Sequence, residues 1–406
     1  MISGSKTGFQ PKPTAIAIDS TPVLVARGLR HLPGLVFLDS SSVSEGESAI
    51  SVVAARSADR VLGNIFLEED CEQLREIIAK YDVGDRFPDF GFPCGGLIGA
   101  VDYDGKFEFG VYPEVLIFDH AQETWHEVGN LSNEVNCLAE LEELDAARFE
   151  FSDGMSRETY CDAVSQAQEY ISAGDIYQVN LTHRLHADFP TGKLDPFGLY
   201  EKVREVSPAP YSGFFELADR TVLSTSPEQF LRLSGRTIQT RPIKGTRPIF
   251  RDRERDEKSA YDLITSPKEI SELIMITDLE RNDLGQICEF GSVEVVDLLK
   301  LERFEQVFHL VSTVQGELRK EIDHVGALAA CFPGGSITGA PKKRAREIID
   351  ELESEPRGLY TGAIGVIGFN GESRFNVAIR TAIIENGELH FHVGAGIVAD
   401  SLPDHE

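Results

Sequence analysis

IGVIGFNGESRFNVAIRTAIIENGELHFHV, at residues 364–393, is the stretch that most clearly indicates how this chain folds. Apolar residues alternate with polar or small ones along it, and the pairs Asn370-Gly371 and Asn386-Gly387 stand between the alternating runs. An Asn-Gly pair in this position is the strongest short-range signal for a β-hairpin turn. The stretch therefore predicts a three-stranded antiparallel meander.

A helix followed by a strand is predicted near the middle of the chain. Residues 156–174 carry apolar side chains at helical spacing, with Ser156 suited to the N-cap and Gly174 to the C-terminal stop. IYQVNL follows directly and alternates, which puts Gln178 and Asn180 on one face of a strand. The opposite face is formed by Tyr177, Val179 and Leu181.

Later segments add a hairpin and two helices. FLRLSGRTIQT, at residues 230–240, predicts two strands around a Ser-Gly turn. SPKEISELIMITDLERNDLG, at residues 266–285, predicts a helix whose start is a capping box formed by Ser266 and Glu269 with proline at the first position. PKKRAREIIDELE, at residues 341–353, predicts another proline-started helix. Antiparallel strands with inserted helices indicate an α+β fold, in contrast to a doubly wound parallel sheet.

Composition restricts the class of partner. The chain has 406 residues, 41% of them hydrophobic, and 39 Lys and Arg against 67 Asp and Glu give a net charge of −28. This length predicts one large or two medium domains. A strongly acidic surface repels phosphate backbones and anionic headgroups, so we expect neither nucleic acid nor membrane as a partner. An anionic small substrate would need a local basic pocket.

Targeting and redox signals indicate a cytoplasmic protein. No run approaches the roughly 18 apolar residues that a membrane span requires, and the first residues lack the apolar core of a signal peptide. The six cysteines lie far apart, without a CxxC pair or zinc-type spacing, so we expect reduced thiols.

The sequence contains no internal repeat and no obvious linker. An acidic stretch at residues 140–153 separates a glycine-rich first third from a more regular remainder. We use it to divide the chain into residues 1–150 and residues 151–406.

Arg380 and a glycine run are candidates for holding a carboxylate. Arg380 is expected on a strand, next to the run HVGAGIVAD at residues 392–400. A guanidinium binds a carboxylate through two parallel hydrogen bonds, and glycines let backbone N–H groups approach it. From residue type alone a structural ion pair is the more common role of such an arginine. The run is not followed by the helix that a dinucleotide-binding fingerprint needs.

Two glutamates and a lysine could carry chemistry. Glu269 and Glu272 lie three apart on one predicted helix and could address one cation, although the capping box already accounts for Glu269. Glu272 borders the apolar face, where a carboxylate needs a partner or a metal. Lys244, in RPIKGTRP, is expected in a rigid turn and could be a nucleophile, although most lysines are solvated. His309 alternates with apolar neighbours and could equally be a structural core histidine.

Several strings together resemble the chorismate-utilising enzymes, which include anthranilate synthase component I, aminodeoxychorismate synthase component I and the isochorismate and salicylate synthases. The chain has no Gly-x-Ser-x-Gly elbow, P-loop or His-Glu-x-x-His motif that would indicate another class. The resemblance implies two facing antiparallel sheets with helices outside, the active site between them, and an N-terminal segment intertwined with the rest. The matching strings, in chain order, are SPEQFLRL, TRPIKGTRP, KEISELIMITDLERNDLG, FHLVSTVQGEL, FPGGSITGAPKKRAREIIDELE, RGLYTGAIG, FNVAIRT and GAGIVADS.

Two positions subdivide the family. The water-using isochorismate synthases look to carry lysine where this chain has Gln178, and anthranilate synthases typically have alanine where it has Lys244. The sequence is therefore most similar to the aminodeoxychorismate synthases, which convert chorismate and ammonia to 4-amino-4-deoxychorismate on the route to 4-aminobenzoate and folate. Anthranilate synthase component I and a catalytically silent chorismate-binding paralogue are the alternatives.

The resemblance also implies roles for individual residues. Lys244 would attack C2 of the ring while Glu228, as general acid, helps the C4 hydroxyl to leave; ammonia would then enter at C4 and expel the lysine. His309 and Gln178 would complete the catalytic group. The residues implied to hold the substrate are Arg380, Tyr360, Thr338, Gly394, Ala395 and Gly396.

Mg²⁺ is the implied cofactor, with Glu272 as a ligand that helps it to neutralise and orient the ring carboxylate. In the family, GAGIVADS continues into a helix with two glutamates three residues apart, the second of them a metal ligand. The sequence ends at Glu406, which matches the first, so Glu406 is the other candidate ligand. Two explanations of the missing second glutamate remain: the terminal helix has been trimmed, or this chain is a damaged copy that binds the metal weakly.

The partners implied are chorismate, ammonia and a glutamine amidotransferase subunit in a heterodimer. Cys94, in PCGGLIG, lacks the elbow of a glutaminase nucleophile, so ammonia must come from that separate subunit. FLDSS, from Phe37, resembles the region where relatives bind tryptophan.

Overall fold

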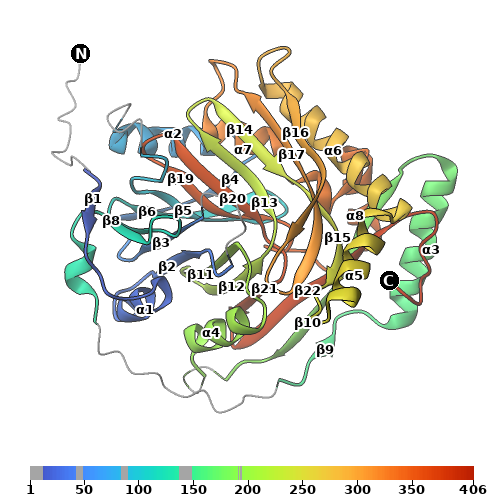
Figure 1. Ribbon diagram of the computed structural model, residues 1–406, viewed down its shortest axis with the longest axis horizontal. Coiled ribbons are helices and arrows are strands. Elements are labelled where there is room, and N and C mark those ends of the chain that lie inside the picture. The colour runs from blue at the N-terminus through green and yellow to red at the C-terminus, as the bar shows by residue number, and fades with distance from the viewer. Residues whose placement is uncertain (1–11, 43–48, 84–89, 137–148, 191, 193) are drawn as a thin grey trace.

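The computed structural model describes residues 12–42, 49–83, 90–136, 149–190, 192 and 194–406 (Figure 1). Within these residues the chain forms two large sheets with helices packed outside them, and every strand pair is antiparallel. The predicted α+β class and the two facing sheets are confirmed.

The first sheet has twelve strands in the described part of the chain. Their order is β1 (Thr14–Ile16), β8 (Thr124–Val128), β7 (Val115–Asp119), β3 (Ile50–Ala54), β2 (Val36–Asp39), β11 (Tyr211–Glu216), β12 (Arg220–Ser226), β21 (Thr381–Glu385), β22 (Glu388–Ile397), β10 (Gln178–Asp188) and β18 (Gly339–Ala340), with β9 (Ser152–Asp153) pairing to β10.

The second sheet has ten strands among the same described residues. Their order is β15 (Ile243–Pro248), β17 (Val307–Glu317), β14 (Thr237–Arg241), β13 (Gln229–Ser234), β20 (Glu372–Val377), β19 (Ala363–Gly368), β5 (Gly96–Val101), β6 (Lys106–Tyr112) and β4 (Asp59–Asn64), with β16 (Glu294–Arg303) pairing to β17.

Both sheets mix strands from the two ends of the chain. In the first sheet β2 pairs with β11, and in the second β5 pairs with β19. The segments before and after residue 150 therefore share both sheets. The acidic stretch used to divide them lies largely in residues 137–148, outside the described residues.

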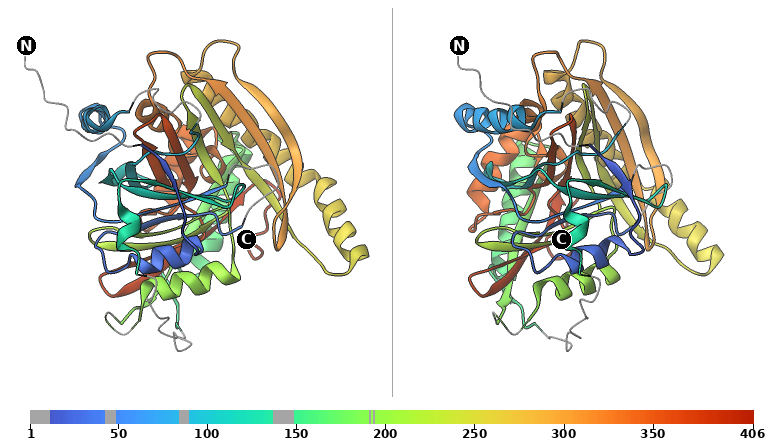
Figure 2. Two further views of the ribbon diagram at one scale, coloured as in Figure 1. Left: turned by 60° about the vertical axis from the view of Figure 1, so that its left-hand side comes forward. Right: turned by 90° about the vertical axis from the view of Figure 1, so that its left-hand side faces the viewer.

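The helices cover the outer faces of the sheets (Figures 1 and 2). Helix α6 packs on β15, β16 and β17, while α3 and α8 cover β10. Helix α5 packs on β15, and its far part projects from the body of the molecule in Figure 2. The bounds are α1 (Pro22–Gly28), α2 (Glu68–Tyr81), α3 (Arg157–Ala173), α4 (Pro196–Val206), α5 (Arg253–Ile264), α6 (Pro267–Ile287), α7 (His324–Cys331) and α8 (Lys342–Leu352).

Part of the core lies between the sheets. Val52 and Val222 of the first sheet belong to the same buried cluster as Ile98 and Val366 of the second. Strand β5 is buried along its whole length because its other face, with Leu97, packs into a second cluster on the far side of its sheet. Burying each such aliphatic side chain contributes roughly 1.5–3 kcal/mol, which favours the closed two-sheet arrangement.

The predicted three-stranded meander is wrong in its pairing. Both Asn-Gly turns form, but β19 and β20 make a hairpin in the second sheet while β21 and β22 make one in the first. Residues 378–380 cross between the sheets, and Arg380 lies in this crossing with a φ of +48°, so it is not on a strand.

Helix starts agree with the sequence in one case and differ in another. The Ser156 side chain accepts a hydrogen bond from the Thr159 N–H, and Gly174 ends α3 with a φ of +83°, as predicted. Helix α6 begins at Pro267, but Ser266 makes no side-chain cap, and Glu269 lies 3.7 Å from Arg247 instead of closing a capping box. The Glu269 carboxylate therefore forms an ion pair that residue type alone does not reveal.

Two smaller expectations were also tested. Tyr177 is 72% exposed and precedes β10, so it does not share the buried face of Val179 and Leu181. The cysteines within the described residues are free, as expected. None of the helices among the described residues is long and apolar enough to cross a membrane.

Candidate active site

Lys244 points into the protein from β15. Its Nζ donates a hydrogen bond to the carbonyl oxygen of Ser336 at 3.2 Å. The strand is irregular here, because the pairing register with β17 shifts between Lys244 and Thr246 and Gly245 has a φ of +71°. Lys244 thus lies at a strand bulge, where the prediction had a turn. Such bulges re-aim side chains near functional sites.

Glu228 lies beside Lys244, on the link between β12 and β13. Its side chain is 5% exposed, and its Oε1 accepts the backbone N–H of Ile243 at 3.4 Å. Burial raises the pKa of Glu228, while a hydrogen bond from the Ser336 side chain and the charge of Lys244 act in the opposite direction. A buried carboxyl with a raised pKa is suited to donate a proton.

Glu272 approaches the same lysine from the first turns of α6. Burial raises its pKa, and Lys244 and Lys268 counteract the increase. Its Oε1 atom is buried and has no hydrogen-bond partner among the described residues. Glu406 also acts on Glu272 electrostatically and lies 3.7 Å from Lys268. The structure therefore brings Lys244, Glu228, Glu272 and Glu406 into one neighbourhood.

These carboxylates are compatible with Mg²⁺. The described residues hold no group of three or more His, Cys, Asp or Glu side chains arranged to bind a metal. Magnesium, however, commonly uses only one or two protein carboxylates and completes its shell with water and substrate oxygens. The orphaned Oε1 of Glu272 fits such a ligand, because a buried carboxylate oxygen without a partner is costly.

A polar wall from β10 and β22 adjoins this neighbourhood. Gln178 is 1% exposed, and its Oε1 has no partner among the described residues. A Cβ added to Gly396 would lie 2.3 Å from the Gln178 Nε2, so only glycine leaves room for that amide. Gly394 and Ala395 stand opposite Thr182 and Leu181 on the same strand pair.

Tyr360 and Thr338 adjoin this wall. The backbone N–H of Asn180 donates to the Thr338 carbonyl oxygen at 2.9 Å. Tyr360 is buried, which raises the pKa of its hydroxyl, and its ring stacks on His392 at 5.2 Å. The Thr338 hydroxyl donates to Gly334 within its own turn, so that hydroxyl shapes the loop.

His309 and Arg380 lie on the other side of Lys244. His309 is 2% exposed, and its Nδ1 lies 3.1 Å from the Gly245 carbonyl oxygen. Burial lowers the pKa of His309 to about 4, and Arg380 adds to the decrease. The imidazole is therefore neutral near pH 7 and, in that form, hydrogen-bonds the lysine-bearing strand.

Arg380 is accessible to solvent, yet the surrounding protein desolvates it enough to lower its pKa. Its guanidinium has no hydrogen-bond or ion-pair partner within the described part of the chain. The expectation that this arginine is buried on a strand is wrong. An unpaired, partly desolvated guanidinium at the crossing between the sheets is nevertheless a suitable anion site.

Ser336 is a site residue that sequence reasoning missed. It lies in a 3-10 turn, Gly335–Ile337, and contacts both Lys244 and Glu228. Its contact with Lys244 is made by the backbone carbonyl oxygen, which no residue type encodes. The only available hint was the paired glycine before it in FPGGSITGAP.

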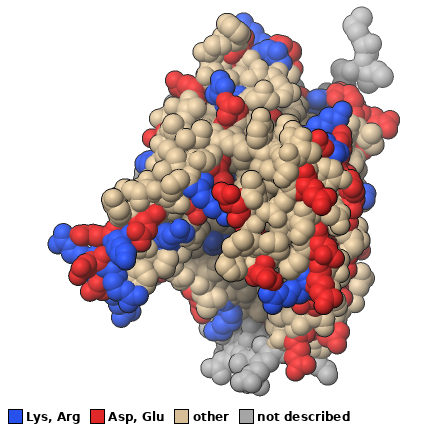
Figure 3. Space-filling model, turned by 90° about the vertical axis from the view of Figure 1, so that its right-hand side faces the viewer, with Lys and Arg blue, Asp and Glu red and all other residues tan. Residues whose placement is uncertain are grey.

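Figure 3 shows a recess on one face of the molecule, with basic side chains at its edge and on its floor and acidic side chains beside those at the edge. Acidic side chains are spread over other parts of the same face. A local basic recess on an acidic protein attracts a small anion that the overall field of charge −28 would repel.

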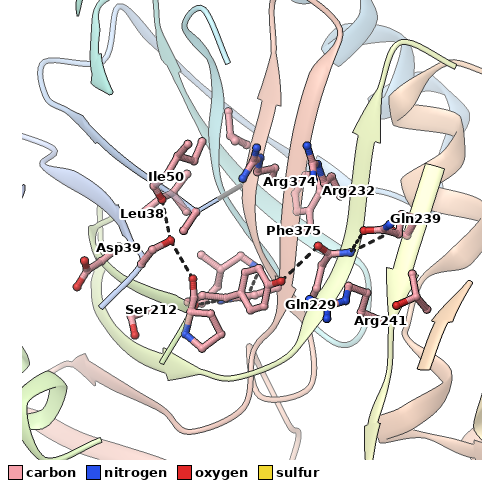
Figure 4. Close-up of a pocket in the computed structure, with 18 of the residues that line it drawn as sticks. Leu38, Asp39, Ile50, Ser212, Gln229, Arg232, Gln239, Arg241, Arg374 and Phe375 are labelled. Atoms are coloured by element: carbon pink, nitrogen blue, oxygen red, sulfur yellow. Dashed lines mark hydrogen bonds between the residues drawn. The ribbon is translucent and has the colours of Figure 1, made fainter. Parts of the chain in front are cut away.

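A separate cavity of about 250 Å³ lies between the sheets (Figure 4). It is lined by Leu38, Asp39 and Ser40 of FLDSS, and not by Lys244, Glu228 or Glu272. Arg232 and Arg374 are register partners on β13 and β20 and lie together along one wall. Burial lowers the pKa of Arg374 to about 10, with Arg232 adding to the effect.

Comparison with known proteins finds relatives that match almost the whole chain. Anthranilate synthase component 1 of Thermus thermophilus is 36% identical over 97% of this chain and 93% of its own length. Aminodeoxychorismate synthase component 1 of Bacillus subtilis is 34% identical over 94% and 87% respectively.

Solved structures show the same fold. The crystal structure of anthranilate synthase component I from Streptococcus pneumoniae aligns with a TM-score of 0.79 and 28% identity over 90% of this chain and 91% of its own. The menaquinone-specific isochorismate synthase of Escherichia coli aligns with a TM-score of 0.77 over 98% and 90%; at 15% identity it supports the fold alone.

The family model described as chorismate binding enzyme matches residues 95–406, which include every strand and helix that positions Lys244, Glu228 and Glu272. The chain is therefore a chorismate-utilising enzyme and belongs to the chorismate-binding enzyme family.

Proposed function

We propose that this enzyme is an aminodeoxychorismate synthase component I, which converts chorismate and ammonia to 4-amino-4-deoxychorismate and water. Relatives named for anthranilate synthase and for aminodeoxychorismate synthase have similar identities, so the names do not choose between them. The placement of Lys244, with its amine directed inward between Glu228 and Glu272, carries the proposal.

In the first step, the neutral amine of Lys244 forms a bond to C2 of the ring. The ring double bonds shift and the C4–O bond breaks, with Glu228 donating the proton that releases the hydroxyl as water. The raised pKa of Glu228 keeps a proton available for this transfer. Lys244 and Glu228 can act together because both contact Ser336.

In the second step, ammonia forms a bond to C4, the double bonds return, and the C2–N bond to Lys244 breaks, which releases the lysine as a neutral amine. The proton that the added ammonia loses returns to Glu228. One difficult displacement is thus divided into two easier ones. Gln178 occupies the position of a water-activating lysine without being able to act as a base, which disfavours water as the incoming group.

Glu272 and Glu406 would hold Mg²⁺, which would supply charge neutralisation to the substrate carboxylate. Arg380 and the Tyr360–Gly396 wall would hold the remaining anionic groups. These roles follow the resemblance, and the free guanidinium of Arg380 and the orphaned Oε1 of Glu272 support them.

Ammonia would come from a glutamine amidotransferase partner. The relatives are named as component 1 of their synthases, which implies a second component. Cys94 cannot replace it, because this thiol is fully buried and burial raises its pKa to about 12, which suppresses the reactive thiolate.

Incubating the purified protein with chorismate, Mg²⁺ and ammonium, followed by chromatography of the products, tests the proposal. Formation of 4-amino-4-deoxychorismate supports it. Anthranilate, detected by its fluorescence, would establish the alternative that the Thermus and Streptococcus relatives favour. Absence of chorismate turnover at any Mg²⁺ concentration would indicate a silent paralogue.

We also propose that the cavity in Figure 4 holds a small effector with a carboxylate, because Arg232 and Arg374 line it and the residues of the reaction do not. The FLDSS resemblance makes tryptophan the first compound to test. Calorimetric titration with tryptophan, with an Arg232→Ala variant beside the parent, should give binding that the variant weakens. Equal binding by both proteins would exclude this cavity.

A further inference from the structure

Glu280 is a buried carboxyl that the reaction described above does not use. It lies in the middle of α6, two turns after Glu272, and is 3% exposed. Its Oε1 accepts the backbone N–H of Gly335 at 2.8 Å, and its Oε2 accepts the Thr240 hydroxyl at 3.3 Å. One side chain thus connects α6 to two separate segments.

Both segments lead to the reacting groups. Gly335 begins the 3-10 turn whose next residue, Ser336, contacts Lys244 through its carbonyl oxygen and Glu228 through its side chain. Thr240 lies on β14, just before the strand that carries Lys244.

Helix α6 and the 3-10 turn Gly335–Ile337 pack closely against each other. A Cβ added to Gly335 would lie 2.7 Å from the Leu279 Cδ2 and 3.0 Å from the Glu280 Oε1. The turn can pack on α6 at this distance only with glycine at position 335. The helix and the hydrogen bond from the Gly335 N–H to Glu280 therefore fix the position of the turn.

We propose that Glu280 is a positioning residue that fixes the distance between the Lys244 amine and the Glu228 carboxyl by holding the turn at Gly335 and the strand at Thr240. The inference rests on the proposed roles of Lys244 and Glu228. Small displacements of such groups are costly, since a shift of about 1 Å can reduce a rate about 10²-fold.

The charges around Glu280 make its effect depend on pH. Lys342 faces Glu280 from α8 and forms an ion pair with Asp283. Asp283, Glu228 and the buried thiol of Cys331 also lie near Glu280. Burial raises the pKa of Glu280 to about 7; Lys342 opposes this and Asp283 adds to it. Below this pH the carboxyl gains a proton and becomes a weaker acceptor for the Gly335 N–H.

The test compares Glu280→Ala, Glu280→Gln and the control Asp278→Asn, an exposed residue of the same helix whose only ion pair is with Arg281 among the described residues. Chorismate consumption is followed, so the comparison does not depend on which product forms. Glu280→Ala should lower kcat about tenfold to a hundredfold with KM changed less than about threefold. Glu280→Gln, which keeps an acceptor oxygen, should restore most of kcat and remove the change in rate near pH 7. Asp278→Asn should match the parent.

A second readout is independent of turnover. Labelling of Lys244 with pyridoxal phosphate and borohydride, quantified by peptide mass spectrometry, should change in Glu280→Ala and not in Asp278→Asn, with thermal unfolding confirming that each variant is folded. A folded Glu280→Ala variant with parental kcat and parental labelling overturns the inference. Anthranilate as the parental product would overturn the proposed function and leave the effect of Glu280 measurable.

Discussion

The Nζ of Lys244 lies 3.2 Å from the carbonyl oxygen of Ser336, near the buried carboxyl of Glu228 and the half-buried carboxyl of Glu272. The amine is therefore directed toward the groups that its proposed reaction requires. The same serine bonds to Glu228 through its side chain, so the proposed nucleophile and the proposed acid share one anchor.

Lys244→Ala should abolish formation of 4-amino-4-deoxychorismate, because the variant lacks the amine proposed to attack C2. Lys244→Arg should also be inactive, since the guanidinium stays protonated and cannot act as a nucleophile. Lys258→Ala, at an exposed position of α5, is the matched control. Product chromatography provides the measurement, and a Lys244→Ala protein that makes the same product at the parental rate would remove Lys244 from the mechanism.

Glu228→Gln should lower kcat about 10²–10⁴-fold, the usual contribution of a general acid. The parent should lose activity as pH rises through the raised pKa of Glu228, because the acid works only while protonated. The pH dependence of kcat under saturating chorismate checks this. A parental rate that stays constant to high pH would assign the proton to another group.

The hairpin turns of the C-terminal stretch can be predicted because turn chemistry is local. Asn386, Gly387 and Gly371 all have positive φ in their turns, as an Asn-Gly pair allows. The sheet that each hairpin joins depends on strands from distant parts of the sequence. The β19 strand pairs with β5 from the first third of the chain, and nothing in its own residues encodes that partner.

The candidate site likewise contains some residues that the sequence identifies and others that it does not. Side-chain chemistry and family resemblance identify Lys244, Glu228 and Glu272, whose positions the structure brings together. The sequence does not identify Ser336, because its contact with Lys244 is made by the backbone carbonyl oxygen, which every residue has. The sequence predicts Arg380 on a strand, where it does not lie. The alternating pattern does not reveal that the chain crosses between the sheets at this point, where Arg380 has a positive φ.

His390 and His392 should make the fold sensitive to acid. Burial lowers their pKa values to about 4 and about 3, against roughly 6.5 in the unfolded chain. The unfolded chain thus takes up protons first as pH falls below about 6.5, and stability present above that pH is lost on the way to pH 4. Each histidine should account for about 2 kcal/mol of this loss at pH 5.

Urea unfolding of the parent and of His392→Phe, at about pH 8 and about pH 5, measures this contribution. Phenylalanine keeps the stacking on Tyr360 and removes the titration. The variant should lose less stability than the parent over this range, while the exposed His31→Gln should behave as the parent. Equal losses in His392→Phe and the parent would contradict the assignment.

Salt should stabilise the protein. A net charge of −28 causes self-repulsion in the compact state, and the screening length shortens from about 10 Å at 0.1 M to about 3 Å at 1 M salt. Tm should therefore rise with KCl over this range and rise less with an uncharged osmolyte of equal osmolality. A Tm that falls with KCl would mean that the ion pairs lost to screening outweigh the repulsion.

Glu272→Gln should raise the Mg²⁺ concentration needed for half-maximal chorismate turnover by at least about tenfold, since even residues that only support a metal ligand typically cost 10–100-fold in affinity. The Oε1 of Glu272 is buried and has no hydrogen-bond partner in the part of the chain that the structure describes, whereas Glu269, three residues earlier, is already paired with Arg247 at 3.7 Å. Glu269→Gln is therefore the matched variant and should shift the Mg²⁺ requirement less than about threefold. Direct binding of Mn²⁺, followed by electron paramagnetic resonance, separates lost metal affinity from lost catalysis. If Glu272→Gln bound Mn²⁺ as the parent does and lost only kcat, this carboxylate would act on the substrate and not on the metal.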